Sequence, residues 1–173
     1  MDDVSNAAAS LHERDFLAWS EDQAMRLRRL AAARADLDLD LENLAEEVES
    51  MGRSDLKAAE SAVVRIIEHL LKLQFSPATE PRGGWECSVD EQRQALRREI
   101  KSSPSLLRRL DLDELYADGL RLASRGMERF GESGAARSLP ARCPYTLAQV
   151  RDPDWWPERS AGAGRSSIDR SGV

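Results

Sequence analysis

The stretch SAVVRIIEHLLKL, residues 61–73, is the most apolar run of the chain. Its apolar residues recur at helical spacing and cover more than half of the circumference, which is typical of a helix buried in a core. An arginine, a glutamate and a histidine interrupt the run, which argues against a membrane-spanning segment. We therefore expect a central core helix that starts at its N-cap Ser54 and runs to about Phe75, where Pro77 terminates it.

On the N-terminal side of this helix we expect two more helices. The first runs from about Glu13 to Ala33, and the second is a short helix that Asp40 caps and Gly52 ends. The short helix is strongly acidic and has one apolar stripe that must pack against the rest of the protein. The stripe consists of Leu41, Leu44, Val48 and Met51.

On the C-terminal side, each further helical segment is predicted from the residues at its start. Capping boxes precede two of the segments, and a serine followed by proline precedes another. The chain is expected to be irregular from Gly131 until the last capped turn. The starting residues are Ser88 with Glu91, Ser103 with Pro104, Asp113, and Thr146 with Gln149.

These elements predict an all-α protein, with strand alternation nearly absent. A chain of 173 residues is long enough for one ordinary core and short for two domains. We expect a single-domain helical bundle of about five to six helices with an irregular C-terminal segment. Residues 1–12 are expected to be flexible, residues 13–157 to form the helical domain, and residues 158–173 to be a disordered tail.

Net charge and cysteine content limit the partners and the cellular setting that we expect for this chain. The formal net charge of −6 makes nucleic acid an unlikely partner, because the protein as a whole repels a phosphate backbone. Cys87 and Cys143 lie far apart with no metal-binding spacing, which fits a reduced, cytoplasmic setting. The acidic N-terminus resembles no export signal, and no membrane partner is expected.

Glu47 and His69 are the first candidates for a site. Glu47 is expected at the border of the apolar stripe, where a carboxylate needs an arginine, a hydrogen-bond donor or a metal ion. His69 is expected at the edge of the core helix, and an imidazole can bind metal or transfer protons. The two would meet if their helices packed antiparallel across Gly52. The alternative is that both residues only make structural contacts.

Arg93, Trp155 and Trp156 are further candidates. Arg93 belongs to a basic helix side that could hold an anion, although a solvated face with ion pairs is the simpler interpretation. Adjacent tryptophans cannot both face inward in regular structure, so at least one of the pair is expected to be exposed to a partner. Motifs of common hydrolases, nucleotide-binding loops and zinc proteases are absent.

Several ordered motifs together resemble the bacterial domain of unknown function 29 family. They are DFLAWSEDQAMRLR, LDLENLAEEVESMGRSD, IIEHLLKLQFSP, a lone Trp85 before EQRQALRREI, then SPSL, Tyr116 and CPYTLAQVRDPDWWP. The resemblance covers about residues 15–157 and implies an all-α bacterial domain without an assigned activity. It also implies that a set of polar signature residues gathers in one buried network. The set is Asp15, Gln23, Asn43, Glu47, His69 and Arg93.

Three functional interpretations follow. The first is a small cytoplasmic interaction or regulatory module, whose partner is another protein or a second copy of the chain. The second is a metal-dependent or acid–base enzyme that uses Glu47 and His69, with Arg93 holding an anionic substrate. The third and weakest is a nucleic-acid-binding module. The sequence predicts no particular cofactor.

Overall fold

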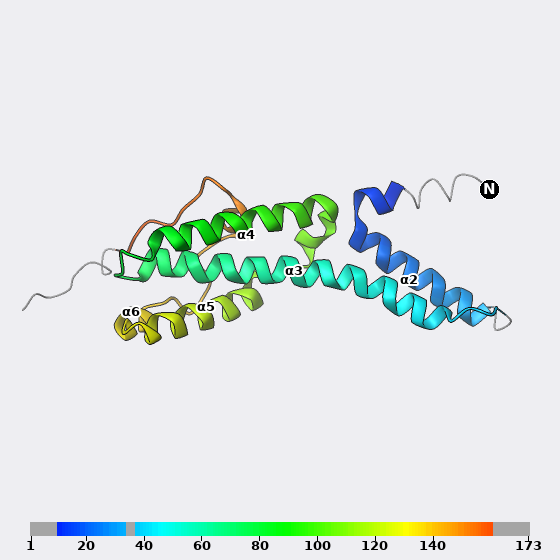
Figure 1. Cartoon of the computed structure of the whole chain (residues 1–173), viewed down its shortest axis with the longest axis horizontal. Helices are drawn as coiled ribbons and strands as arrows, with labels where there is room; N and C mark the ends of the chain where they lie inside the picture. The colour runs from blue at the N-terminus through cyan, green and yellow to red at the C-terminus, as the bar shows by residue number, and fades with distance from the viewer. Residues whose placement is uncertain (1–9, 34–36, 161–173) are drawn as a thin grey trace, which may run out of the picture. The chain divides into compact units, whose positions relative to one another are not determined.

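The computed structural model describes residues 10–33 and 37–160, and almost all of its regular structure is helical (Figure 1). No strand occurs in these residues, so the predicted all-α class is confirmed. Residues 10–14 form a first helical turn. The following elements are α2 (Phe16–Ala33), α3 (Leu41–Phe75), α4 (Arg82–Ser102), the 3₁₀ helix η1 (Pro104–Arg108), α5 (Leu112–Arg129), α6 (Ser133–Arg137) and α7 (Leu147–Arg151).

The predicted chain ends fall mainly outside the described residues. Of the predicted flexible N-terminus, residues 1–9 lie outside them, and residues 10–12 are helical. Of the predicted disordered tail, residues 161–173 lie outside them. Residue Ser160 donates its backbone N–H to the carbonyl of Gln74 at 2.9 Å, so the start of this segment is held against α3.

Helix α3 continues through Gly52, so the predicted helix end at this residue is wrong. Gly52 is buried, and a Cβ atom placed on it would collide with Ser20 Oγ and lie 3.1 Å from Leu17 Cδ1. The glycine therefore allows α2 to approach α3 closely, and it does not turn the chain. Asp40 does cap this long helix as expected, because its Oδ1 accepts the backbone N–H of Asn43 at 3.2 Å.

Helix α4 begins six residues before the predicted capping box at Ser88 and Glu91, so that prediction is wrong. The N–H of Trp85 donates to the carbonyl of Pro81 at 3.1 Å, which closes the first turn of the helix. Gly83 and Gly84 are thus helical although their residue type disfavours it. The capping box of Thr146 with Gln149, in contrast, is confirmed at the start of α7.

The chain forms two compact units. Unit 1 contains residues 1–62 and 94–111, and unit 2 contains residues 63–93 and 112–173. Helices α3 and α4 each contribute residues to both units. The predicted helical domain of residues 13–157 spans most of the described residues of both units.

The core of unit 1 is built from leucine and alanine side chains. On α3, Leu41 and Ala45 are buried, whereas Leu44 and Met51 are 45% and 53% exposed. The predicted stripe is therefore partly wrong, because Leu44 and Met51 lie outside the core although Leu41 is buried. The remaining buried apolar residues of this unit are Leu17, Ala24, Ala59, Ala62, Leu96, Leu106 and Leu110.

Asp15 fastens α2 to η1 within unit 1. Its Oδ1 accepts the backbone N–H of Ala18 at 3.1 Å and the hydroxyl of Ser105 at 2.7 Å, and its Oδ2 accepts the backbone N–H of Ser105 at 2.8 Å. Ser103 precedes η1 and accepts the backbone N–H of Leu17 at 3.1 Å. These bonds hold the start of α2 and the start of η1 together, and we call Asp15, Ser103 and Ser105 the clamp of unit 1. The polar residues at the start of α2 are therefore structural.

The core of unit 2 is formed by the apolar face of the stretch at residues 63–73. Ile66, Ile67 and Leu70 are fully buried, and burial of each stabilises the fold by roughly 1.5–3 kcal/mol. Helix α5 lies alongside this part of α3 (Figure 1). Their close packing depends on Gly119, because a Cβ atom there would lie 2.7 Å from Ile67 Cγ2. The predicted central core helix and its end at Phe75 are confirmed, but its predicted start at Ser54 is wrong, because α3 runs through this residue.

None of the helices in the described ranges combines the length and the apolar character needed to cross a membrane.

Candidate functional site

A cavity of about 610 Å³ lies in unit 2. Sites for small molecules commonly measure roughly 300–1,000 Å³ and are mainly apolar with a few polar groups. The walls of this cavity follow the same pattern, with two aromatic and three charged side chains. The lining residues are Lys72 of α3, Ala78, Glu80 and Pro81 of the following loop, Trp85 of α4, Gly126 and Met127 of α5, and Phe130 and Glu132 after α5.

The turn that ends α5 shapes one wall of the cavity. Gly131 has a φ of 81°, and its N–H donates to the carbonyl of Glu128 at 3.0 Å. The N–H of Glu132 donates to the carbonyl of Met127 at 2.9 Å, which completes a Schellman motif. This turn carries Phe130, which is 80% exposed, and Glu132 to the cavity.

Lys72 contributes an ammonium group that is already paired. Its Nζ lies 2.6 Å from Glu68 Oε1, and both side chains are largely buried. Burial by itself raises the pKa of Glu68, but the hydrogen bond and charge of Lys72, followed by the hydrogen bond of Arg65, bring that pKa below its usual value. Gly126 makes room for the lysine, since a Cβ atom there would lie 2.9 Å from Nζ. Glu68 thus compensates the positive charge on this wall.

Glu132 contributes a carboxylate with no partner in the described protein. It occupies the N-cap position of α6 but makes no capping hydrogen bond with its side chain. Its Oε2 atom is buried and has no hydrogen-bond partner among the described residues. A buried acceptor without a donor costs about 1–3 kcal/mol, and more when it is charged. Glu132 is therefore the lining residue best placed to accept a hydrogen bond from a ligand.

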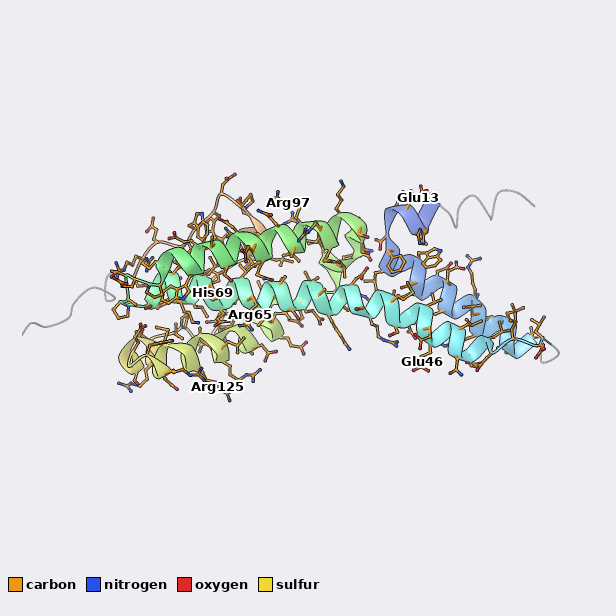
Figure 2. All side chains as sticks on the ribbon, in the orientation of Figure 1. Glu13, Glu46, Arg65, His69, Arg97 and Arg125 are labelled. Carbon is orange, nitrogen blue, oxygen red and sulfur yellow. The ribbon has the colours of Figure 1, made fainter. Side chains whose placement is uncertain are left out.

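His69, a predicted candidate, lies one turn before Leu73 on α3 and is half-buried (Figure 2). Burial is the main reason why its pKa lies below the usual value, and the charges of Lys72 and Arg65 lower it further against the opposing effect of Glu68. Its Nδ1 atom is buried without a hydrogen-bond partner in the described chain. The imidazole is therefore neutral at neutral pH, and it does not line the cavity.

Glu47, the other main candidate, is exposed on α3 in unit 1. Because α3 is continuous, Glu47 and His69 lie about six turns apart along one helix. The predicted antiparallel meeting of these two residues across Gly52 is therefore wrong. Across residues 10–33 and 37–160, no group of three or more His, Cys, Asp or Glu side chains is arranged to hold a metal ion.

The predicted single polar network is also wrong, because its members have separate surroundings. Asn43 is exposed and donates its side-chain N–H to Asp40, and Gln23 donates to Asp22. Asp15 belongs to the clamp of unit 1, whereas His69 and Arg93 belong to unit 2.

Arg93 holds the C-terminal segment of unit 2. Its Nε donates to the carbonyl of Val150 at 3.0 Å, and its Nη2 donates to the carbonyls of Gln149 at 3.2 Å and Trp155 at 2.8 Å. The guanidinium also lies 4.8 Å from the ring centroid of Trp156. Three of its contacts are to main-chain carbonyls, which makes this arginine a structural clamp. Its predicted action on an anionic substrate stays a prediction.

The predicted interaction residues differ in exposure. Trp155 is half-buried and packs edge-on against Tyr145, with ring centroids 5.6 Å apart. Trp156 is 36% exposed on the outer side of Arg93. Their arrangement agrees with the argument that the pair cannot both face inward. Binding of a partner by either residue stays a prediction.

Cys143, Tyr116 and Tyr145 form a second set of contacts in this segment. The Tyr145 hydroxyl donates to Gln74 Oε1 at 2.8 Å, and the Tyr116 hydroxyl donates to the carbonyl of Pro140. Burial raises the pKa of Tyr116 to about 12, and it also raises the pKa values of Tyr145 and Cys143. Burial thus favours the protonated form of all three groups. The two tyrosine hydroxyls connect segments that are distant in the chain.

Sequence reasoning missed most residues of the cavity. Phe130 was placed only at the end of a predicted helix and Glu132 only in the irregular region after it, and Lys72 appeared only within the motif IIEHLLKLQFSP. One usable signal was Gly131 directly after an aromatic residue at the end of a helix, because such a glycine often reverses the chain and presents its neighbours. No local pattern indicates that Trp85 and Phe130 line the same cavity.

The chain was compared with known proteins. The family model described as Domain of unknown function DUF29 matches residues 11–156. A crystal structure of an alpha-helical protein of unknown function from Rhodospirillum rubrum is similar, with a TM-score of 0.74 and 29% sequence identity over 83% of this chain and 90% of that chain. No curated protein matches the chain. The similarity to the solved structure agrees with the helical fold.

Proposed function

The chain belongs to the family described as Domain of unknown function DUF29, and on that premise we propose that it is a regulatory module that binds a small ligand in the cavity of unit 2. The cavity is the observation that carries the proposal. Its volume of about 610 Å³ and its largely apolar walls suit a small organic molecule or a side chain of that size. We place the module in the bacterial cytoplasm, which fits its free cysteines and the bacterial source of the similar structure.

Binding has more support than catalysis because of the groups that line the cavity. The lysine is paired with Glu68, and the remaining charged lining residues are the carboxylates Glu80 and Glu132. The alternative enzyme built on Glu47 and His69 has less support, since these residues are separated along α3. An interaction or regulatory role therefore remains the better interpretation.

A pair of matched variants tests the proposal. Ala78 lines the cavity in a loop, so Ala78→Phe is expected to fill part of the space without interrupting a helix. Ala117→Phe adds the same side chain at an exposed position of α5 and serves as the control. Ligand-observed NMR of the full chain with a library of small organic fragments measures binding.

We expect fragments that bind the unmodified chain and the Ala117→Phe variant and lose about tenfold or more in affinity with Ala78→Phe, a change of about 1.4 kcal/mol. Fragments that bind all three proteins equally well occupy another surface. Such a result, or a complete absence of binding fragments, would contradict the proposal.

A further inference from the structure

The side chains around the cavity leave more negative than positive charge uncompensated. Three charged side chains line it, namely Lys72, Glu80 and Glu132. The lysine is compensated by Glu68 at 2.6 Å. Glu68 also accepts from Arg65, whose side chain is 56% exposed, so water screens that second cation. Two carboxylates of the lining are left without a compensating protein cation in the described ion pairs.

One of these carboxylates requires a donor. Glu132 Oε2 is buried and has no hydrogen-bond partner among the described residues, and the side chain does not cap α6 although it stands at the N-cap. Removing a carboxylate oxygen from water is unfavourable unless a donor replaces the water. A positively charged donor compensates both the hydrogen bond and the charge.

Two aromatic side chains of the lining favour the same kind of ligand. Trp85 is half-buried in the first part of α4, and Phe130 is 80% exposed beside the cavity. Aromatic faces attract cations through their electron density, and they also cover apolar groups.

From these observations we infer that the cavity binds an organic cation, an ammonium group attached to an apolar body. The inference rests on the proposed binding function and names its ligand class. The ammonium group donates to Glu132 and lies within the field of Glu80. The apolar body contacts Met127, Trp85 and Phe130.

Three probes with similar carbon skeletons and different charges separate charge from apolar contact. They are phenethylamine, phenethyl alcohol and phenylacetate, titrated into the full chain by NMR. We expect the amine to bind about tenfold or more tightly than the alcohol, because a hydrogen bond to a charged group adds that much affinity, and the carboxylate to bind most weakly.

Substitutions of the carboxylates test whether the preference for the amine arises in the cavity. Glu132→Gln is expected to reduce amine binding to the level of the alcohol and leave alcohol binding unchanged. Glu128→Gln removes the same charge from an exposed position of α5 and is expected to keep the preference. If Glu132→Gln does not fold, Glu80→Gln at an exposed loop position is expected to weaken amine binding in the same direction.

The outcomes distinguish the ligand class from the binding function. If alcohol and amine bind equally and Ala78→Phe weakens both, the cavity binds ligands but the cation inference is wrong. Preferential binding of phenylacetate would overturn the inference in favour of Lys72 as the recognising group. If none of the probes and none of the fragments binds, both the inference and the proposed function fail.

Discussion

Among the described residues, the buried polar side chains of unit 1 have hydrogen-bond partners, whereas those of unit 2 include nitrogen and oxygen atoms without one. In unit 1 the serines at positions 20, 103 and 105 are all hydrogen-bonded. Four buried side-chain atoms lack a partner in the described chain, and all four belong to unit 2. They are His69 Nδ1, Arg82 Nη1, Arg93 Nη1 and Glu132 Oε2.

This difference distinguishes polar residues that hold the fold together from polar residues that are available to bind a ligand. Fully paired groups, such as Asp15 with Ser105, hold helix ends in place and have no remaining capacity to bind a ligand. Unpaired buried groups are exceptions in native proteins and require an explanation. Only Glu132 among the four lines the cavity, so it combines an unmet hydrogen bond with space for a ligand. Unit 1 is therefore interpreted as structural and unit 2 as the binding unit.

The largest expected effect comes from removing the clamp of unit 1. Asp15→Ala removes a helix cap and leaves the buried N–H of Ser105 without its acceptor, which we expect to lower the free energy of unfolding by about 2–4 kcal/mol. Asp40→Ala removes only an exposed cap at the start of α3, and we expect a loss of about 1 kcal/mol. Chemical denaturation of both variants measures the difference. Equal losses would show that the clamp adds nothing to capping.

The next-largest effect on stability is expected at Gly52 of unit 1, and Gly83 of unit 2 serves as the comparison. Gly52→Ala places a methyl group against Ser20 and Leu17, and we expect this overpacking to cost about 1–3 kcal/mol. Gly83→Ala meets no atom within 4 Å and lies in α4, so we expect a gain of up to about 1 kcal/mol from helix propensity. Thermal unfolding of the two variants gives the signs. A stabilising Gly52→Ala would refute the close approach of α2 to α3.

A smaller effect is expected from the clamp of unit 2. Arg93→Lys keeps the charge but cannot reproduce the bonds to three carbonyls, and we expect a loss of about 1–2 kcal/mol. Arg97→Lys, at an exposed position of α4, is the control. Limited proteolysis between Tyr145 and Pro157 should be faster only in the first variant. Unchanged proteolysis would mean that other contacts hold this segment.

The smallest effect concerns the protonation of His69. Its folded-state pKa lies below the unfolded value, mainly through burial, and the facing charges are Glu68, Lys72 and Arg65. The unfolded chain therefore takes up the proton first, so stability is complete above about pH 6.5 and falls as the pH is lowered. The lowered pKa of Glu68 acts only below about pH 4.5, outside this window.

Urea denaturation of His69→Gln tests this dependence. The unmodified chain should be less stable at about pH 5.5 than at about pH 7.5, and the variant should show a flatter dependence. His12→Gln, at an exposed position, is the control. The same pH dependence in all three proteins would assign the change to other groups.

Much of the helix content could be predicted from local sequence. The caps at Asp40 and Thr146 were recognisable because the capping side chain and its partner lie within one turn. Predictions were wrong where the same local sequence pattern is compatible with two different local structures. Gly52 was expected to end a helix, but a glycine is equally suited to a close approach inside one.

The candidate site was less predictable than the fold. Glu47 and His69 were chosen from residue type and expected helix borders, and the continuity of α3 separates them. Arg93 was expected on a basic helix side that is solvated or holds an anion, but its acceptors are carbonyls of a segment that follows much later in the chain. Carbonyl groups are the same at every residue, so the sequence contains no signal for these contacts.

The sequence by itself determined that this protein is helical, where several helices start, and which family it resembles, because periodicity, caps and motifs are properties of neighbouring residues. The tertiary structure decided the division into two units, the cavity beside Trp85 and Phe130, and the unpaired carboxylate of Glu132. These features depend on which side chains face one another from distant segments. The free energy of a buried charge is set by those neighbours, and the residue type alone does not determine it.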